Sequence, residues 1–265
     1  MKKVAFYVVF PVVFGFLPSA TATAQAPDTV YNQVDEHGLK QGYWQKKYPN
    51  GQIAYRTLFV DDKPRGLLVR YHENGKRMAL IDYFDGGNIS LAQFFSSNGA
   101  LIAEGRYLNE KKKQGLWKYY KNDKLAMAEN YENGLLEGTS SSYYPNGKIF
   151  ERKRFKNGQQ EGVYEQLDEQ GHLMSEAMFA RGLRNGGIRY YYTNNRIRIE
   201  GQYTDNVRTG EWTFYSPTGA VERKTTYVQG FAADRDSIDK KNSDLLKSME
   251  ANKGLFVDPE DMFEE

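Results

Sequence analysis

The sequence predicts an all-β protein, an elongated repeat array of about eight 24-residue β-hairpin units that form one continuous antiparallel meander sheet with a C-terminal capping helix. The first observation behind this prediction is that an aromatic residue recurs every 24 positions, which predicts a shared structural position in every unit. We call these residues the aromatic column: Phe59, Tyr83, Tyr107, Tyr131, Phe155, Phe179, Tyr203 and Tyr227. The second is a column of Gly, Asn and Asp with the same spacing, which are the residues that adopt a positive φ in hairpin turns. It comprises Gly51, Gly75, Gly99, Asp123, Gly147, Gly171, Asn195 and Gly219.

The N-terminal residues 1–24 have the layout of a signal peptide. Lys2 and Lys3 precede an apolar run over 4–17, and small residues follow it. This run is shorter than the roughly 20 apolar residues of a membrane-spanning helix. We expect cleavage after Ala24, a linker over 25–35, and export of the protein to the periplasm or out of the cell.

Charge and cysteine content exclude several classes of partner and of stabilisation. Removal of residues 1–24 takes away two of the 36 basic residues and none of the 34 acidic ones, so 34 of each remain. A balanced chain is not expected to bind nucleic acid, nor to bind anionic membranes strongly. The absence of cysteine excludes disulfides and a lipid anchor on a cysteine.

Each unit of the predicted repeat domain, residues 36–230, consists of two strands and two turns. In Tyr144-Pro145-Asn146-Gly147, proline presets φ and glycine takes the left-handed position of a bulged hairpin turn. The runs on either side are rich in Tyr, Phe, Ile and Thr, which favour strands. Because strand side chains alternate between faces, polar residues lie on the face opposite the aromatic column. They include Arg56, Glu104, Arg152, Glu176, Glu200 and Lys224.

Residues 231–265 are expected to end the array with a capping helix and an acidic tail. Residues 237–252 place Ile238, Leu245, Leu246 and Met249 on one helical stripe. We expect this helix to lie across the last strand and to cover its edge. The tail over 258–265 is acidic.

The segment 143–162, which reads YYPNGKIFERKRFKNGQQEG, resembles the MORN-repeat variant found in bacterial YwqK-family antitoxins. The resemblance covers about residues 36–230, and the units that open at Gly42, Gly138 and Gly210 match best. Departures from the pattern are Ser90 and Gln114 at the opening glycine, Asp123 and Asn195 at the turn glycine, and Leu167-Asp168 in place of Tyr-Tyr. The resemblance implies a scaffold that contacts proteins or lipids, and its label implies an antitoxin.

No catalytic or metal-binding constellation is expected, and no cofactor. The histidines His37, His72 and His172 fall in different units, whereas a metal site needs ligands that converge. The segment 234–239 resembles a calcium loop but lacks the central glycine and the terminal glutamate. The protein is therefore predicted not to be an enzyme.

Aromatic residues outside the main column are the candidate binding residues. We expect them to form a row of rings on the polar face, which either covers Lys and Arg side chains or lines a groove for an extended partner. The candidates are Trp44, Tyr48, Trp117, Tyr120, Tyr144, Tyr192 and Trp212.

Three functions are consistent with such a surface. The first is a non-enzymatic scaffold that binds a protein partner in the cell envelope or outside the cell. The second is a glycan or cell-wall module, since the sequence GLWKYY over 115–120 is similar to choline-binding wall repeats. The third is an antitoxin or immunity-type protein. Exposed, evenly spaced rings would favour a glycan, and buried rings in a polar surface would favour a protein.

Overall fold

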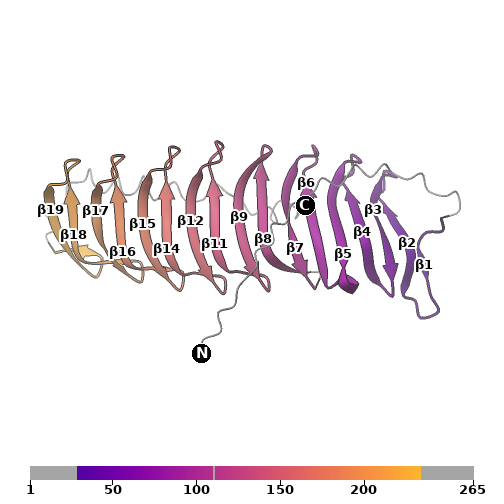
Figure 1. Ribbon diagram of the computed structural model, residues 1–265. Helices are drawn as coiled ribbons and strands as arrows, with labels where there is room; N and C mark the ends of the chain where they lie inside the picture. Colours follow the sequence, from indigo (N-terminus) through magenta and orange to yellow (C-terminus); the bar gives the residue numbers. More distant parts are fainter. Residues whose placement is uncertain (1–28, 110, 234–265) are drawn as a thin grey trace, which may run out of the picture.

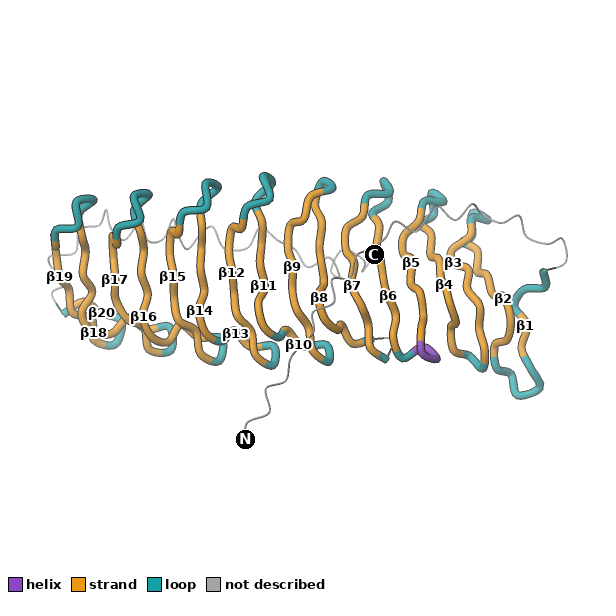
Figure 2. The backbone as a smooth tube through the Cα atoms, viewed as in Figure 1, coloured by secondary structure: helices purple, strands orange, loops and turns teal. Residues whose placement is uncertain are grey.

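The computed structural model describes residues 29–109 and 111–233, which form one open, single-layer antiparallel sheet. Consecutive strands pair with each other along the chain, so the sheet is a meander whose two ends are far apart (Figures 1 and 2). At about 4.8 Å between neighbouring strands, its sixteen long strands extend over about 70 Å. The predicted all-β repeat sheet is thus confirmed.

The sixteen long strands, two for each unit, are β2 (Lys40–Lys47), β3 (Ile53–Val60), β4 (Lys63–Tyr71), β5 (Arg77–Phe84), β6 (Ile89–Phe95), β7 (Leu101–Leu108), β8 (Lys112–Lys121), β9 (Lys124–Glu132), β11 (Gly138–Tyr143), β12 (Ile149–Lys156), β14 (Gly162–Leu167), β15 (Leu173–Ala180), β16 (Leu183–Tyr191), β17 (Ile197–Thr204), β18 (Val207–Tyr215) and β19 (Val221–Val228). Shorter elements are β1 (Gln33–Val34), β10 (Leu135–Leu136), β13 (Gln159–Gln160), β20 (Phe231–Ala232) and the 3₁₀ turn η1 (Asp85–Gly87).

Two kinds of turn alternate along the sheet. In the predicted turn between β11 and β12, the amide of Gly147 donates to the carbonyl of Tyr144 at 2.8 Å, and Gly147 has φ 84°. Most of the other turns are two-residue hairpins with both residues left-handed, as in Asp205-Asn206 (φ 48° and 68°), whereas the β5–β6 and β7–β8 turns are longer. This geometry matches the right-handed twist of the flanking strands and favours Asn, Asp and Gly.

The fourth unit is shifted by one residue relative to the 24-residue pattern, and a shorter turn in the same unit reverses the shift. Gly115, rather than Gln114, pairs with the column residue Tyr131, because three residues instead of two separate the paired residues Leu108 and Lys112. The turn that follows is a two-residue hairpin of Asn122 and Asp123 with positive φ. Asp123 therefore does not replace the glycine of a Pro-Asn-Gly turn, and the shorter turn restores the spacing.

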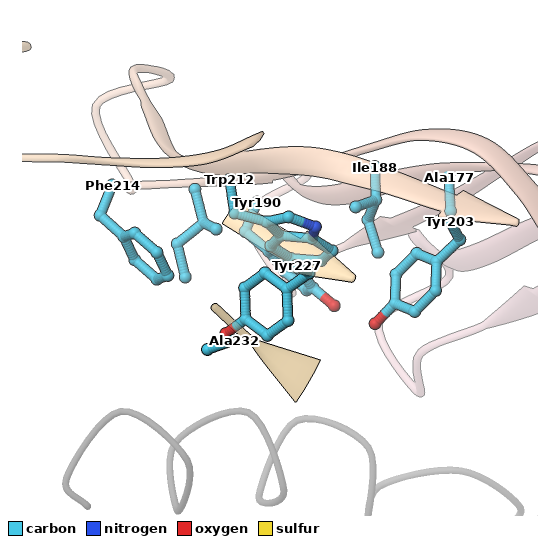
Figure 3. Packing of buried hydrophobic residues seen from close by; sticks show 9 residues of the cluster. Ala177, Ile188, Tyr190, Tyr203, Trp212, Phe214, Tyr227 and Ala232 are labelled. Carbon is cyan, nitrogen blue, oxygen red and sulfur yellow. The ribbon is translucent and has the colours of Figure 1, made fainter. Parts of the chain in front are cut away.

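The two faces of the sheet differ in composition. We call the side that carries the aromatic column the aromatic face, and the opposite side the mixed face. Cross-strand pairs place Trp44, Trp117 and Trp212 on the aromatic face, because they pair with Thr57, Glu129 and Thr225. Two apolar clusters form there, and Figure 3 shows side chains of the C-terminal one.

The C-terminal cluster is the larger of the two. Its buried members are Ala177, Ile188, Tyr190, Ile199, Tyr203, Trp212, Phe214, Tyr227 and Ala232. The second cluster has Ala92, Ala103, Trp117 and Tyr119 as its buried members. Of the aromatic column, Tyr203 and Tyr227 are buried and the other six are partly buried.

The fifth unit separates the two clusters with polar side chains. Ser140, Ser142, Glu151 and Lys153 occupy its aromatic-face positions. Lys153 Nζ donates to Glu151 Oε1 at 2.6 Å, and the Ser142 hydroxyl donates to the same oxygen at 3.3 Å. The apolar face is thus divided near its middle.

The ends of the repeat domain differ slightly from the expected boundaries. Within the expected linker 25–35, Gln33–Val34 forms β1 and pairs with β2. Beyond residue 230, Phe231–Ala232 forms β20 and pairs with β19. The expected signal peptide over 1–24, the capping helix over 237–252 and the acidic tail lie outside the described residues.

Candidate interaction surface

The three candidate tryptophans do not lie on the polar face as predicted. Trp117 and Trp212 are 1% and 0% exposed on the aromatic face, at the centres of the two clusters. Each indole lies against a strand glycine, Gly105 or Gly201, where a Cβ would overlap the ring. Trp44 lies on the same face, with its ring centroid 5.9 Å from that of Phe59 in an edge-to-face arrangement. The prediction of an exposed row is therefore wrong for these residues.

Tyr48, Tyr144 and Tyr192 belong to the turns and connect neighbouring units. Each hydroxyl donates to a main-chain carbonyl 23 residues further on, at 2.8, 2.9 and 2.8 Å respectively. The side-chain amides of the turn residues Asn146 and Asn194 also donate to main-chain carbonyls 23 residues further on, both at 3.0 Å. These side chains stabilise the stacking of units, because a half-buried carbonyl needs a donor.

Tyr120 is the one candidate that lies on the mixed face. Its hydroxyl donates to Glu104 Oε1 at 2.7 Å. Partial burial and this carboxylate raise the pKa of the Tyr120 phenol. Tyr191 and Tyr215 make the corresponding bonds to Glu176 and Glu200, at 2.7 and 2.5 Å. The seven candidates thus serve different structural positions and do not form one row.

A ladder of charged residues runs along the middle of the mixed face. Arg152 contacts Glu165 at 2.9 Å, and Arg189 contacts Glu176 at 3.0 Å and Glu200 at 3.5 Å. These residues pair directly across neighbouring strands, so the row is continuous in register. Surface pairs of this kind stabilise little individually, and the ladder keeps the face hydrated.

An aliphatic band lies beside this ladder, and sequence analysis missed it. Sixteen large apolar side chains of the described residues are strongly exposed, and register places thirteen of them on the mixed face. They are Tyr43, Val60, Leu67, Phe84, Leu91, Leu116, Leu135, Val163, Met178, Leu183, Val207, Val228 and Phe231. We call this set the aliphatic band. Extended apolar surfaces on soluble proteins mark interaction sites.

The band is hollowed in the C-terminal half of the sheet. Gly187 takes the position that Leu91, Leu116 or Val163 takes in other units, which leaves a groove of about 440 Å³. Val163 and Met178 line one part of the groove. The carboxylates that line it are Glu176, Glu200 and Glu211. Arg189 also lines the groove and is ion-paired with Glu176 and Glu200, so the groove combines an apolar wall with charged groups of both signs.

The described residues include no group of three or more His, Cys, Asp and Glu side chains arranged to hold a metal ion. His37 lies near Glu36 at 3.6 Å, His72 bonds the carbonyl of Phe95, and His172 pairs with Asp168 at 2.9 Å. The calcium-loop-like segment 234–239 lies outside the described part of the chain. Among described residues, no helix has the length and apolar character needed to cross a membrane.

The fold and the inter-unit bonds define the class of protein as an open repeat array of β-hairpins. Three segments, residues 40–61, 136–157 and 208–229, match the family model of the MORN repeat variant. These segments lie in the units that open at Gly42, Gly138 and Gly210, as the resemblance implied. No curated protein matches the chain.

Proposed function

We propose that the protein is an exported, non-enzymatic repeat scaffold whose mixed face binds a protein partner in the cell envelope or outside the cell. The observation that supports this proposal is the aliphatic band, whose members recur in register along the whole sheet. An elongated band of this kind fits an extended partner better than a compact ligand. Export is proposed from residues 1–24, and mass spectrometry of the mature protein is expected to find Gln25 as its first residue.

The positions of the rings favour a protein over a glycan. Trp117, Trp212, Tyr119 and Tyr190 are buried in the sheet and cannot stack on a sugar. The strongly exposed apolar side chains of the mixed face are mostly aliphatic. A glycan or cell-wall ligand stays as the alternative, which the similarity of residues 115–120 to wall-binding repeats suggests.

A capture experiment from a cell-envelope extract tests the proposal. The band variant carries Leu67→Ser, Leu91→Ser and Leu116→Ser, at side chains 51%, 39% and 49% exposed. The control variant carries Val30→Ser and Val34→Ser, which are similarly exposed but lie outside the band. We expect a discrete protein to bind the wild type and the control and to be lost from the band variant.

Other outcomes of this experiment contradict the proposal. Equal capture by the band variant would place the binding surface elsewhere. Retention on purified peptidoglycan or polysaccharide without a protein would favour the glycan alternative. An antitoxin or immunity role, which the resemblance to YwqK-family proteins implies, would require the captured protein to be a toxin whose activity the wild type suppresses.

A further inference from the structure

The aromatic face is strongly basic, although the mature chain has no net charge. Cross-strand pairing places eight basic residues and two acidic residues on the strands of this face, a difference of six positive charges. The basic residues are Lys40, Lys46, Arg70, Lys113, Lys153, Arg184, Arg208 and Arg223. The acidic residues are Glu129 and Glu151.

Several of these cations lie over the aromatic rings. Lys40 lies 5.2 Å from the ring centroid of Trp44, Lys113 lies 5.1 Å from Trp117, and Arg208 lies 4.7 Å from Trp212. Each tryptophan thus has a cation four residues earlier in the sequence. Rings hold these cations next to an apolar surface, and the face attracts a ligand that is both apolar and acidic.

The C-terminal segment 234–265 has the complementary composition. It contains ten acidic and five basic residues, a net charge of −5, and its last eight residues contain five acids and no base. It also contains large apolar residues, among them Leu245, Leu246, Met249, Phe256 and Phe263. No other stretch of the chain outside the described residues is acidic, since 1–28 contains a single acid, Asp28.

The described chain ends where this segment could reach the aromatic face. Ala232 of β20 is 7% exposed and packs in the C-terminal cluster, and the described residues stop at Ala233. Nine strand spacings separate β19 from β8, a span of about 40 Å. Even with the helix that the sequence predicts over 237–252, the chain from Ala233 to Asp258 is long enough to span about 50 Å. The acidic tail is therefore long enough to reach Arg208, Arg184, Lys153 and Lys113.

We propose that residues 234–265 bind back onto the aromatic face of their own sheet, with the acidic tail next to its row of cations. This docking covers the partly buried rings that the single-layer sheet leaves accessible. It also leaves the mixed face as the surface for other molecules. The inference does not depend on the proposed partner, because it concerns the opposite face.

Carbodiimide coupling in the full-length protein, followed by peptide mass spectrometry, tests this contact. The reagent joins a lysine amine to a carboxylate that touches it. Strand β16 offers a matched pair, since Arg184 pairs with Phe179 on the aromatic face and Arg189 pairs with Glu176 on the mixed face. In Arg184→Lys we expect a new amide between residue 184 and a carboxylate of 258–265. In Arg189→Lys we expect no amide between residue 189 and that tail.

Salt and charge provide a second readout. Coupling of the tail to position 184 is expected to be lost at 1 M salt, where the Debye length is about 3 Å. It is also expected to fall when Asp258→Asn, Glu260→Gln and Asp261→Asn are combined with Arg184→Lys, since three of the five acidic side chains of 258–265 are then neutral. Tail coupling at position 189, or no tail coupling at 184 in a variant with wild-type circular dichroism, would overturn the proposal. Coupling only between different molecules would also overturn it.

Discussion

At the scale of single residues, two strand glycines explain why the tryptophans are buried. Gly105 and Gly201 have no side chain, and the indoles of Trp117 and Trp212 occupy the space that a Cβ would need. Gly105→Ala or Gly201→Ala is expected to displace the ring and to destabilise the protein by about 1–3 kcal/mol, the range for overpacked cores. Urea unfolding followed by tryptophan fluorescence measures this change.

Gly187 provides the control for this prediction. It is also a strand glycine without a left-handed φ, but no atom lies within 4 Å of the position of its Cβ. Gly187→Ala should be neutral or stabilising by up to about 1 kcal/mol, because alanine restricts the unfolded chain. Equal losses at Gly187 and Gly105 would show that the two indoles are not seated on glycines.

At the scale of the turns, the repeated tyrosine hydroxyl connects one unit to the next. Tyr144→Phe removes the hydrogen bond to the carbonyl of Leu167 and is expected to cost about 1 kcal/mol. The adjacent Tyr143 is a matched control, since its hydroxyl makes no hydrogen bond with the described residues. Tyr143→Phe should leave the urea midpoint unchanged. If both variants unfold alike, the hydroxyl of Tyr144 does not hold the turns together.

The tyrosine–glutamate pairs of the mixed face are expected to make the stability of the fold decrease at alkaline pH. Partial burial, and then the hydrogen bond to Glu176, raise the pKa of Tyr191 from 10.0 to about 12. Because the folded pKa is the higher one, the protonated phenol stabilises the fold fully below pH 10, and this contribution is lost as the pH rises toward 12. Tyr191→Phe should therefore lose less stability than the wild type between these pH values. Parallel urea midpoints across this range would contradict the prediction.

Repeat spacing was sufficient to predict the strands, the turns and the aromatic face, but not the positions of the candidate rings. The aromatic column recurs at every unit, and the structure places its turn residues as expected in every unit except the fourth, where Asp123 lies in a shorter hairpin. The face of Trp44 depends on the cross-strand partner of Gly42, which is Phe59, and this register is not visible in strand parity alone. The aliphatic band was missed because its residues vary in type from Tyr43 to Leu67 and Val163.

Hydrogen bonds between turns were equally hidden from the sequence. From the sequence alone, Tyr48, Tyr144 and Tyr192 were candidate binding residues. In the structure, the hydroxyl of each one donates a hydrogen bond to a main-chain carbonyl of the following unit. The available signal was that Tyr recurs directly before the turn, in the sequence YPNG at 48–51 and 144–147 and YTNN at 192–195. A residue that repeats with the turn belongs to the scaffold. Residues that vary between units are better candidates for partner recognition.

At the scale of the whole molecule, the polar fifth unit divides the array into two packed regions. Ser140, Ser142, Glu151 and Lys153 lie between a cluster with nine buried members and one with four. Stability in a repeat array is approximately a sum over units and their interfaces, so a weak interface allows the two parts to unfold separately. We expect the N-terminal region, with the smaller cluster, to unfold at the lower urea concentration.

The tryptophans report on the two regions separately, which makes this expectation measurable. Trp117 lies in the smaller cluster and Trp212 in the larger one. A variant with Trp44→Phe and Trp212→Phe reports through Trp117, and a variant with Trp44→Phe and Trp117→Phe reports through Trp212. Since each replacement weakens its own cluster, the wild type must also show two transitions by hydrogen exchange, with β14–β19 protected to higher urea than β6–β9. A single transition shared by all probes would mean that the two clusters unfold together and that the polar fifth unit couples them.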